Sequence, residues 1–271
     1  MKNNFKSFIS NHRKEYLFQN KRYNFLLRFF QIFVLVFTIL IWEIFSVFGI
    51  IDSFLVSSPS RILAVFLNFQ NNNLFMHIGV TVFETLIGFL LGVVIGIGIA
   101  FLLWCFDFLS KVLEPYLVIL NALPKIALGP IIIIWVGAGM QAVIIMALSI
   151  SVIVTIMEML NGFKNTDTEL IKMAKTFGSG KIKTFAKIVF PYNLPTLFNC
   201  LKINMGLSLV GVIAGEFLVS RAGLGFLIIY GGQVFQMDLV MSSVIILGIL
   251  ASLLYKIISF VQNIVMRQMF N

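Results

Sequence analysis

Long apolar blocks, separated by short polar and basic stretches, fill most of this chain. A helix needs roughly 20 apolar residues to cross a hydrocarbon core of about 30 Å. Six segments reach about that length: 29–50, 79–104, 114–136, 139–160, 193–219 and 239–262. Each is expected to be helical, because unpaired backbone groups are too costly in lipid. The pattern predicts an all-α polytopic membrane protein with about six transmembrane helices.

Two further apolar segments are too short to cross a membrane. Residues 52–77 contain the turn sequence Ser57-Ser58-Pro59-Ser60, followed by an apolar stretch from Ile62 to Phe69. Ser60 is expected to cap a short interfacial helix there. Residues 221–238 include the run LGFLIIYGGQVF, for which a surface helix or a re-entrant segment fits best.

The composition agrees with a membrane location. Hydrophobic residues make up 59% of the chain and charged residues 11%, with a mean hydropathy of +1.01. A soluble domain of this size carries roughly 25% charged residues. The apolar excess must therefore face something other than water, and lipid is the plausible candidate.

The distribution of Lys and Arg predicts the orientation. With the N-terminus placed in the cytoplasm, sixteen of the twenty basic residues lie inside: Lys2, Lys6, Arg13, Lys14, Lys21, Arg22, Arg28, Lys111, Lys164, Lys172, Lys175, Lys181, Lys183, Lys187, Lys256 and Arg267. Only Arg61 and Arg221 lie outside, while Lys125 and Lys202 lie within spans. The positive-inside rule then predicts that both termini are cytoplasmic, and it explains the net charge of +9 without a nucleic-acid partner.

This topology divides the chain into three parts. Residues 1–28 form a cytoplasmic basic arm, 29–265 a transmembrane domain with a cytoplasmic loop at 161–192, and 266–271 a C-terminal tail. The arm is long for the basic region of a signal peptide, and the apolar run after it lacks a small-residue cleavage site. The first span is therefore expected to stay uncleaved.

The second span carries a stripe of residues at four-residue spacing: Glu84, Gly88, Gly92, Gly96 and Ala100. Small residues at this spacing let two helix backbones approach closely. The stripe predicts either helix packing within one subunit or a contact between subunits of a dimer.

The third span contains Pro124, Gly129 and Pro130 within the run NALPKIALGPIIIIWVGAG. The prolines lack the amides that would bond to the carbonyls of Leu120 and Ile126. Freed carbonyls at membrane depth are tolerated only inside protein or beside a wet cavity. This helix is therefore expected either to lie beside a transport path or to form a packed kink.

Lys125 lies between these prolines, and an ionised side chain at mid-depth is expensive and usually functional. Three interpretations stay open: contact with a substrate, pairing with another group, or snorkelling toward an interface. The candidate residues of a translocation path are Pro124, Lys125, Gly129, Pro130 and Glu216.

Four carboxylates lie in or near the spans: Glu43, Glu84, Glu158 and Glu216. A proton-coupled transporter would need such groups as a relay. Glu158 and Glu216 fall at predicted span ends, where water is close. That leaves Glu43 and Glu84 as the deeper pair, which could also pair with Lys125.

The sequence shows no metal-ligating cluster and no nucleophile constellation, so no cofactor and no catalytic residue are expected. Cys105 and Cys200 lie at the ends of apolar segments and are expected to be inert buried thiols. His12 lies in the arm and His77 at an outer span edge, where each is expected to be solvated or interfacial.

The longest inside loop between spans, 161–192, predicts a short helix presented to the cytoplasm. It carries a cap, an apolar face and a glycine stop, in this order: Thr166 or Asp167, then Ile171, Ala174 and Phe177, then Gly178 and Gly180. A second short helix is expected over 182–189, after which Pro191 and Pro195 open the fifth span. A helix with one apolar face and a lysine-rich remainder can dock in a groove on a partner.

The loop resembles the EAA loop of bacterial ABC importer permeases. Four positions of that motif are matched with their spacing preserved: Ala174, Gly178, Ile188 and Pro191. Three positions differ: Lys172 stands where the family has Glu, Met173 where it has Ala, and Phe190 where it has Leu. The missing acid leaves a specific ion pair to the ATPase in doubt, but not the docking helix. The residues to which the resemblance gives a role in ATPase coupling are Lys172, Met173, Ala174, Phe177, Gly178, Ile188 and Pro191.

The runs LPKIALGPIIIIWVGAG, EFLVSRAGLG and TLIGFLLGVVIG are similar to the nitrate, sulfonate and taurine group of these permeases, which includes transporters for thiamine-pyrimidine precursors. The similarity covers residues 30–265. It implies a permease dimer in the bacterial plasma membrane, with two cytoplasmic ATPase subunits and an extracytoplasmic substrate-binding protein. The implied substrate is a small anion such as sulfonate, taurine or nitrate, or a thiamine-pyrimidine precursor.

A permease driven by a separate ATPase needs no nucleotide site and is not an enzyme. The run FGSGKIKT lacks the spacing of a phosphate-binding Walker A loop, because Lys175 and Ile182 replace its first Gly and its Ser or Thr. An ion-coupled secondary transporter is the alternative, and it predicts inverted repeats, which the sequence does not show. A membrane enzyme lacks a candidate site.

Overall fold

The computed structural model describes residues 2–67 and 73–270, with the side chains of residues 2–21, 24 and 270 excepted. His12, most of the basic arm and Phe69 therefore lie outside the side chains described. The described ranges are helical throughout their regular structure and contain no strand. The chain forms two compact units, Met1–Ala64 and Val65–Asn271.

The first unit consists mainly of one long helix, α1 (Lys2–Val47), followed by α2 (Ser53–Val56) and the start of α3 (Pro59–Leu67). The basic arm continues directly into the first span, Phe25–Val47, as a single helix. Asp52 caps α2 by accepting a hydrogen bond from the Phe54 amide at 2.8 Å. The Glu43 carboxylate, expected to be a deep group, accepts a hydrogen bond from the Ser60 amide at 3.0 Å.

The expected N-cap of α3 was wrong by two residues. The helix begins at Pro59, and the Ser58 hydroxyl accepts a hydrogen bond from the Arg61 amide at 3.3 Å. Proline suits the first helical position, because its fixed φ is already helical and the amide it lacks would have no intrahelical partner there.

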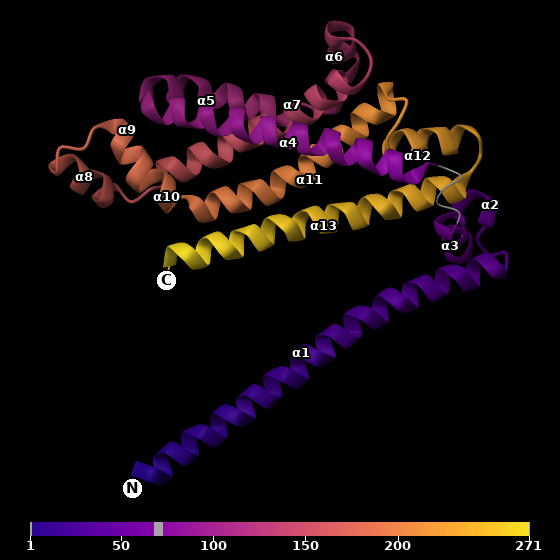
Figure 1. Ribbon diagram of the computed structural model, residues 1–271, viewed down its shortest axis with the longest axis horizontal. Helices are drawn as coiled ribbons and strands as arrows, with labels where there is room; N and C mark the ends of the chain where they lie inside the picture. The colour runs from indigo at the N-terminus through magenta and orange to yellow at the C-terminus, as the bar shows by residue number, and fades with distance from the viewer. Residues whose placement is uncertain (1, 68–72, 271) are drawn as a thin grey trace. The chain divides into compact units, whose positions relative to one another are not determined.

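Three long helices form the centre of the second unit: α4 (Leu74–Cys105), α7 (Met140–Lys164) and α11 (Leu194–Val219) (Figure 1). The glycine stripe of α4 explains how closely α4 approaches α7. A Cβ atom added at Gly88 would lie 2.6 Å from the Ala147 Cβ, and one at Gly96 would lie 2.5 Å from the Thr155 Cβ. Packing within one chain therefore uses the stripe, the first of the two predicted alternatives.

Two further helices complete this unit. The short segment expected at 221–238 contains α12 (Leu224–Gln233), and α13 (Met237–Phe270) packs against both α12 and α11. Leu254 and Ile258 of α13 share a core with Phe198 and Met205 of α11. In the described residues, five helices are long and apolar enough to cross a membrane, and a bent helix pair would make a sixth.

The bent pair corrects the prediction of one kinked helix over 114–136. The chain instead forms α5 (Asp107–Ala122), the 3-10 turn η1 (Lys125–Leu128) and α6 (Gly129–Val136), with a bend of 87°. Leu123 takes an extended conformation, which the residue before a proline favours, so α5 ends at Ala122. Pro130 then occupies the first turn of α6. Proline here breaks the helix rather than kinking it.

The long helices run between two ends of the second unit (Figure 1). One end, the α8 end, carries α8 (Thr168–Thr176), α9 (Lys181–Thr184) and the C-terminus. The opposite end, the α12 end, carries α6 and α12. These two ends hold the candidate sites described below.

Candidate functional site

The helix predicted in the 161–192 loop is α8, and its ends are built as expected. The Asp167 carboxylate accepts a hydrogen bond from the Glu169 amide at 2.8 Å, so Asp167 rather than Thr166 is the N-cap. At the other end, the Gly178 amide donates to the Lys175 carbonyl at 2.9 Å and the Ser179 amide to the Ala174 carbonyl at 3.0 Å. This is a Schellman motif, and Gly178 has the positive φ of 74° that it requires.

The apolar face of α8 is divided between the inside and the outside of the chain. Ile171 packs against the core around Phe163, and Ala174 is 7% exposed. Phe177 is instead 83% exposed and Met173 51% exposed, and Ile182 after the turn is 72% exposed. Part of the predicted apolar face, Ile171 and Ala174, therefore holds α8 on its own subunit, and Met173 and Phe177 are left exposed.

A ring cluster fixes the base of this segment, and the sequence analysis missed it. Phe185 lies in the π-helical turn η2 (Phe185–Val189), with ring centroids at 4.4 Å from Phe101, 5.3 Å from Trp104 and 4.9 Å from Phe163. These partners come from the ends of α4 and α7, far away in sequence. In the sequence, the one signal that could have predicted this cluster is the presence of aromatic residues at the ends of the apolar runs.

One buried side-chain amide links the two ends of this segment by hydrogen bonds. The Asn193 side chain donates to the Thr166 hydroxyl at 2.7 Å and to the Val189 carbonyl at 2.8 Å. Asn193 follows α10 (Phe190–Tyr192), so residues before α8 and after η2 are bonded together. Ile188 and Pro191, matched in the EAA motif, are half-buried beside this closure. Residues 166–193, here called the coupling segment, thus form one body with an exposed tip.

The candidate path residues are not all brought together. Pro124, Lys125, Gly129 and Pro130 lie at the break between α5 and α6. The Lys125 ammonium donates to the backbone and side-chain oxygens of Asn121, at 2.9 and 3.3 Å. Lysine at a helix C-terminus satisfies carbonyls that have no intrahelical partner. Both of these hydrogen bonds are to α5, so pairing is local rather than with Glu84.

Glu216 was expected near water, and this was wrong. It is 1% exposed, and its carboxylate accepts hydrogen bonds from the Thr81 hydroxyl at 2.7 Å and from the Gly225 amide at 2.5 Å. Thr81 in turn accepts from the Leu224 amide at 2.8 Å. Side chains of α4 and α11 thereby accept hydrogen bonds from the first amides of α12. We call this set of hydrogen bonds the α12 clasp.

His77 belongs to the α12 clasp, so of the two expectations, solvated or interfacial, the solvated one was wrong, since the side chain is 7% exposed. Its Nδ1 accepts a hydrogen bond from the Gly223 amide at 3.0 Å, and its ring stacks on Phe226 at 5.9 Å. Glu84, also 1% exposed, contacts the Glu216 carboxyl. Glu84 and Glu216 therefore form a buried acidic pair within the second unit.

A cavity of about 510 Å³ lies beside the clasp. It is bordered by Glu84, by the turn between α6 and α7, and by the loop between α11 and α12, including Arg221. Gly129 at the start of α6 packs closely on Leu218 of α11 and Met146 of α7, which brings the break at Lys125 against the helix that carries Glu216.

Three comparisons place this architecture among known proteins. The chain is 30% identical over 217 residues to a probable ABC transporter permease of Haemophilus influenzae, covering 80% of this chain and 88% of the relative. It is 26% identical to the formylaminopyrimidine transport permease of Halalkalibacterium halodurans, covering 83% and 90%. The fold matches an inward-facing methionine ABC transporter with a TM-score of 0.63 at 21% identity, covering 72% of this chain and 95% of that one.

The family model described as binding-protein-dependent transport system inner membrane component matches residues 88–271. That stretch contains the coupling segment, the broken α5–α6 span and most of the helical core. The resemblance to ABC importer permeases is thus confirmed, and the chain is a transport subunit rather than an enzyme. This protein belongs to the family of binding-protein-dependent transport system inner membrane components.

Proposed function

We propose that this chain is the membrane-spanning subunit of an ABC importer, which works as a homodimer and is driven by cytoplasmic ATPase subunits. The observation that carries the proposal is the coupling segment. Its base is held by Phe185 and Asn193, while its tip presents Phe177 and Met173 to solvent. A partner that binds the tip would move the base with it, because hydrogen bonds within the segment join the two.

Lysines around the tip support a cytoplasmic location for the α8 end. Lys172 and Lys175 are exposed on α8, and Lys181, Lys183 and Lys187 follow it. The positive-inside rule then favours a multi-pass protein of the bacterial plasma membrane with its α12 end outside. An extracytoplasmic binding protein would deliver substrate to that end.

Each proposed site residue has a distinct part in this mechanism. Lys172, Met173 and Phe177 would contact the ATPase, while Ala174, Gly178, Ile188 and Pro191 shape and hold the segment. Substrate would cross between two copies, beside the α5–α6 break at Pro124, Lys125, Gly129 and Pro130 and past the loop held by Glu216. These assignments rest on position and exposure in the fold.

For the substrate, we propose a small anion such as sulfonate, taurine or nitrate, or a thiamine-pyrimidine precursor. The relative named for formylaminopyrimidine transport supports the second class. The ammonium of Lys125 at the α5–α6 break and the guanidinium of Arg221 beside the cavity support an anionic group on the cargo.

The test is co-purification of the chain with the ATPase encoded beside it, comparing Gly178→Asp with Gly180→Asp. Both glycines have open space around them, but Gly178 has a φ of 74° and Gly180 an ordinary φ of −71°. Gly178→Asp strains the Schellman turn and puts a negative charge at a helix C-terminus, so it should abolish coupled ATP hydrolysis while the chain still folds. Normal coupling in Gly178→Asp would refute the docking assignment.

An ion-coupled secondary transporter remains the second candidate, because Glu84 and Glu216 form a buried acidic pair. Uptake by the lone chain in proteoliposomes under a proton gradient, abolished by Glu84→Gln, would favour it. Uptake that depends on ATP and the partner subunits would exclude it.

A further inference from the structure

Helix α5 is only loosely held by the rest of the second unit. It packs on α4 and α7 much less extensively than these two helices pack on each other. Large apolar side chains along it are exposed, among them Phe108, Tyr116 and Ile119. Beyond the 87° break after Ala122, α6 packs on α7 and α11, with Ile132 buried against Met146 and Ala214. Contacts along α5 itself are fewer, so each of them matters for where α5 lies.

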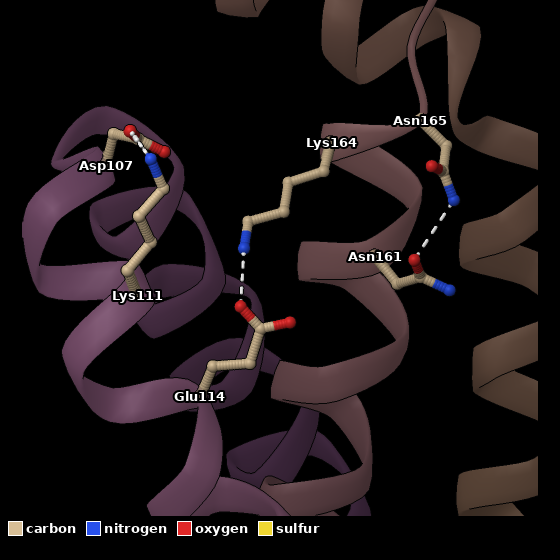
Figure 2. Close-up of polar contacts among 6 residues, drawn as sticks. All are labelled: Asp107, Lys111, Glu114, Asn161, Lys164 and Asn165. Atoms are coloured by element: carbon tan, nitrogen blue, oxygen red, sulfur yellow. Dashed lines mark hydrogen bonds and ion pairs between the residues drawn. The ribbon is translucent and has the colours of Figure 1, made fainter.

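Two of those contacts come from lysines at the coupling segment, Lys164 just before it and Lys181 within it. Lys164, the last residue of α7, forms an ion pair with Glu114 of α5 at 2.9 Å (Figure 2). Lys181, the first residue of α9, donates to the carbonyl of Cys105 at 3.1 Å, two residues before α5 begins. Thr168, where α8 begins, lies four residues after Lys164.

The interface crossed by the ion pair is only partly filled by apolar packing, because Leu113 and Leu117 of α5 pack against the core around Leu160 and Phe163. A cleft of about 230 Å³ lies between α5 and α7, lined by Glu114, Glu158, Asn161 and Lys164 together with apolar residues. Asn161 bonds to Asn165 within its own helix end (Figure 2). The ion pair thus borders the cleft and adds a charged contact to the apolar one that holds α5 on α7.

We propose that the Glu114–Lys164 ion pair, together with the Lys181–Cys105 contact, positions α5 and passes the movement of the coupling segment to the α5–α6 hairpin. Lys164 and Glu114 are positioning residues that act through the hairpin. The inference rests on the proposed function, because the movement starts at an ATPase bound to α8. It adds the route by which that movement reaches the broken span.

The ion pair is half-exposed, with 33% and 57% of the Lys164 and Glu114 side chains accessible. Such a pair shifts an equilibrium by at most about fivefold. Loss of the pair should therefore leave folding and ATPase binding intact, and should reduce the response of the hairpin by about threefold to fivefold.

The experiment measures that response directly. Leu123, exposed at the break, is changed to Cys in a Cys105→Ala, Cys200→Ala background, which keeps the Cys105 carbonyl. The chain is reconstituted in nanodiscs with its cognate ATPase, and the rate of maleimide labelling is compared with and without ATP. The probe is ATP alone, so no transported substrate is needed.

In the parent, ATP should change the labelling rate. Lys164→Met and Glu114→Gln should each reduce that change by about threefold to fivefold while ATP hydrolysis persists. The double charge exchange Lys164→Glu, Glu114→Lys should restore it. The matched control is the Asp107–Lys111 pair, also at 2.9 Å but contained within α5 (Figure 2). Asp107→Asn, Lys111→Met should leave the response unchanged.

An unchanged response in Lys164→Met and Glu114→Gln, or no recovery in the charge exchange, would overturn the inference. Failure of the proposed function looks different: the parent would then neither retain the ATPase nor change its labelling with ATP. An equal loss of response in the Asp107–Lys111 control would also overturn the inference about the Glu114–Lys164 pair. A general effect of charge on α5 would then explain the result.

Discussion

The α12 clasp and the coupling segment are both short connections between long helices, yet they are built in opposite ways. The clasp is buried, and side chains of α4 and α11 take up the amides at the start of α12. The coupling segment is buried only at its base, and its tip exposes apolar side chains to solvent. The difference agrees with the proposal that the tip contacts the ATPase, whereas the clasp satisfies groups within the chain itself.

The strongest test of this contrast is to add a methyl group at a glycine of the clasp, where there is no room for it. At Gly223 a Cβ atom would collide with the Glu216 carboxylate, and φ is 112°. Gly223→Ala should therefore lower the free energy of unfolding by roughly 3 kcal/mol, from overpacking plus backbone strain. Thermal unfolding in detergent measures it. Gly232→Ala, on the same helix with open space around it, is the control and should change little.

Removing a hydrogen-bond acceptor from the clasp should lower the free energy of unfolding by a smaller amount. Glu216→Ala leaves the buried Thr81 hydroxyl and Gly225 amide without their acceptor, which should cost about 2 kcal/mol. Glu84→Gln should cost less than about 1 kcal/mol, since its amide can still donate to Glu216. Equal unfolding temperatures for these two variants would contradict a clasp centred on Glu216.

The exposed tip should show the smallest effect on stability and a large one on assembly. Phe177→Ala removes a side chain that is 83% exposed, so the free energy of unfolding should change by less than about 0.5 kcal/mol. Binding of the ATPase should fall markedly, as seen by co-purification. A Phe177→Ala variant that unfolds easily, or that keeps full ATPase binding, would remove the contrast between tip and clasp.

Local features of the fold could be read directly from the chain. The apolar blocks predicted the long helices, with α7 and α11 starting within one residue of expectation. Asp167 and Gly178 end α8 through bonds to their own neighbours, so their residue types suffice to predict them. The prolines at 124 and 130 indicated a disturbed helix, although not the 87° break.

Features that depend on distant partners could not be read in this way. Glu216 lies near the end of its helix, which suggests water, but α12 folds back over it and buries it. His77 lies at the start of a helix, where contact with water is likewise expected. Its hydrogen-bond partner Gly223, however, lies 146 residues away in the chain. The aromatic partners of Phe185 come from two other helices.

Hydrophobic periodicity, caps and glycine stops act over a few residues, so the helical segments, several of their ends and the loop that resembles a coupling loop follow from the residues alone. Which carboxylates meet, how the third span breaks, and which side chains of α8 are exposed became clear only from the folded chain. Those outcomes depend on helix packing, in which residues far apart in the chain remove water from one another and supply each other's hydrogen bonds.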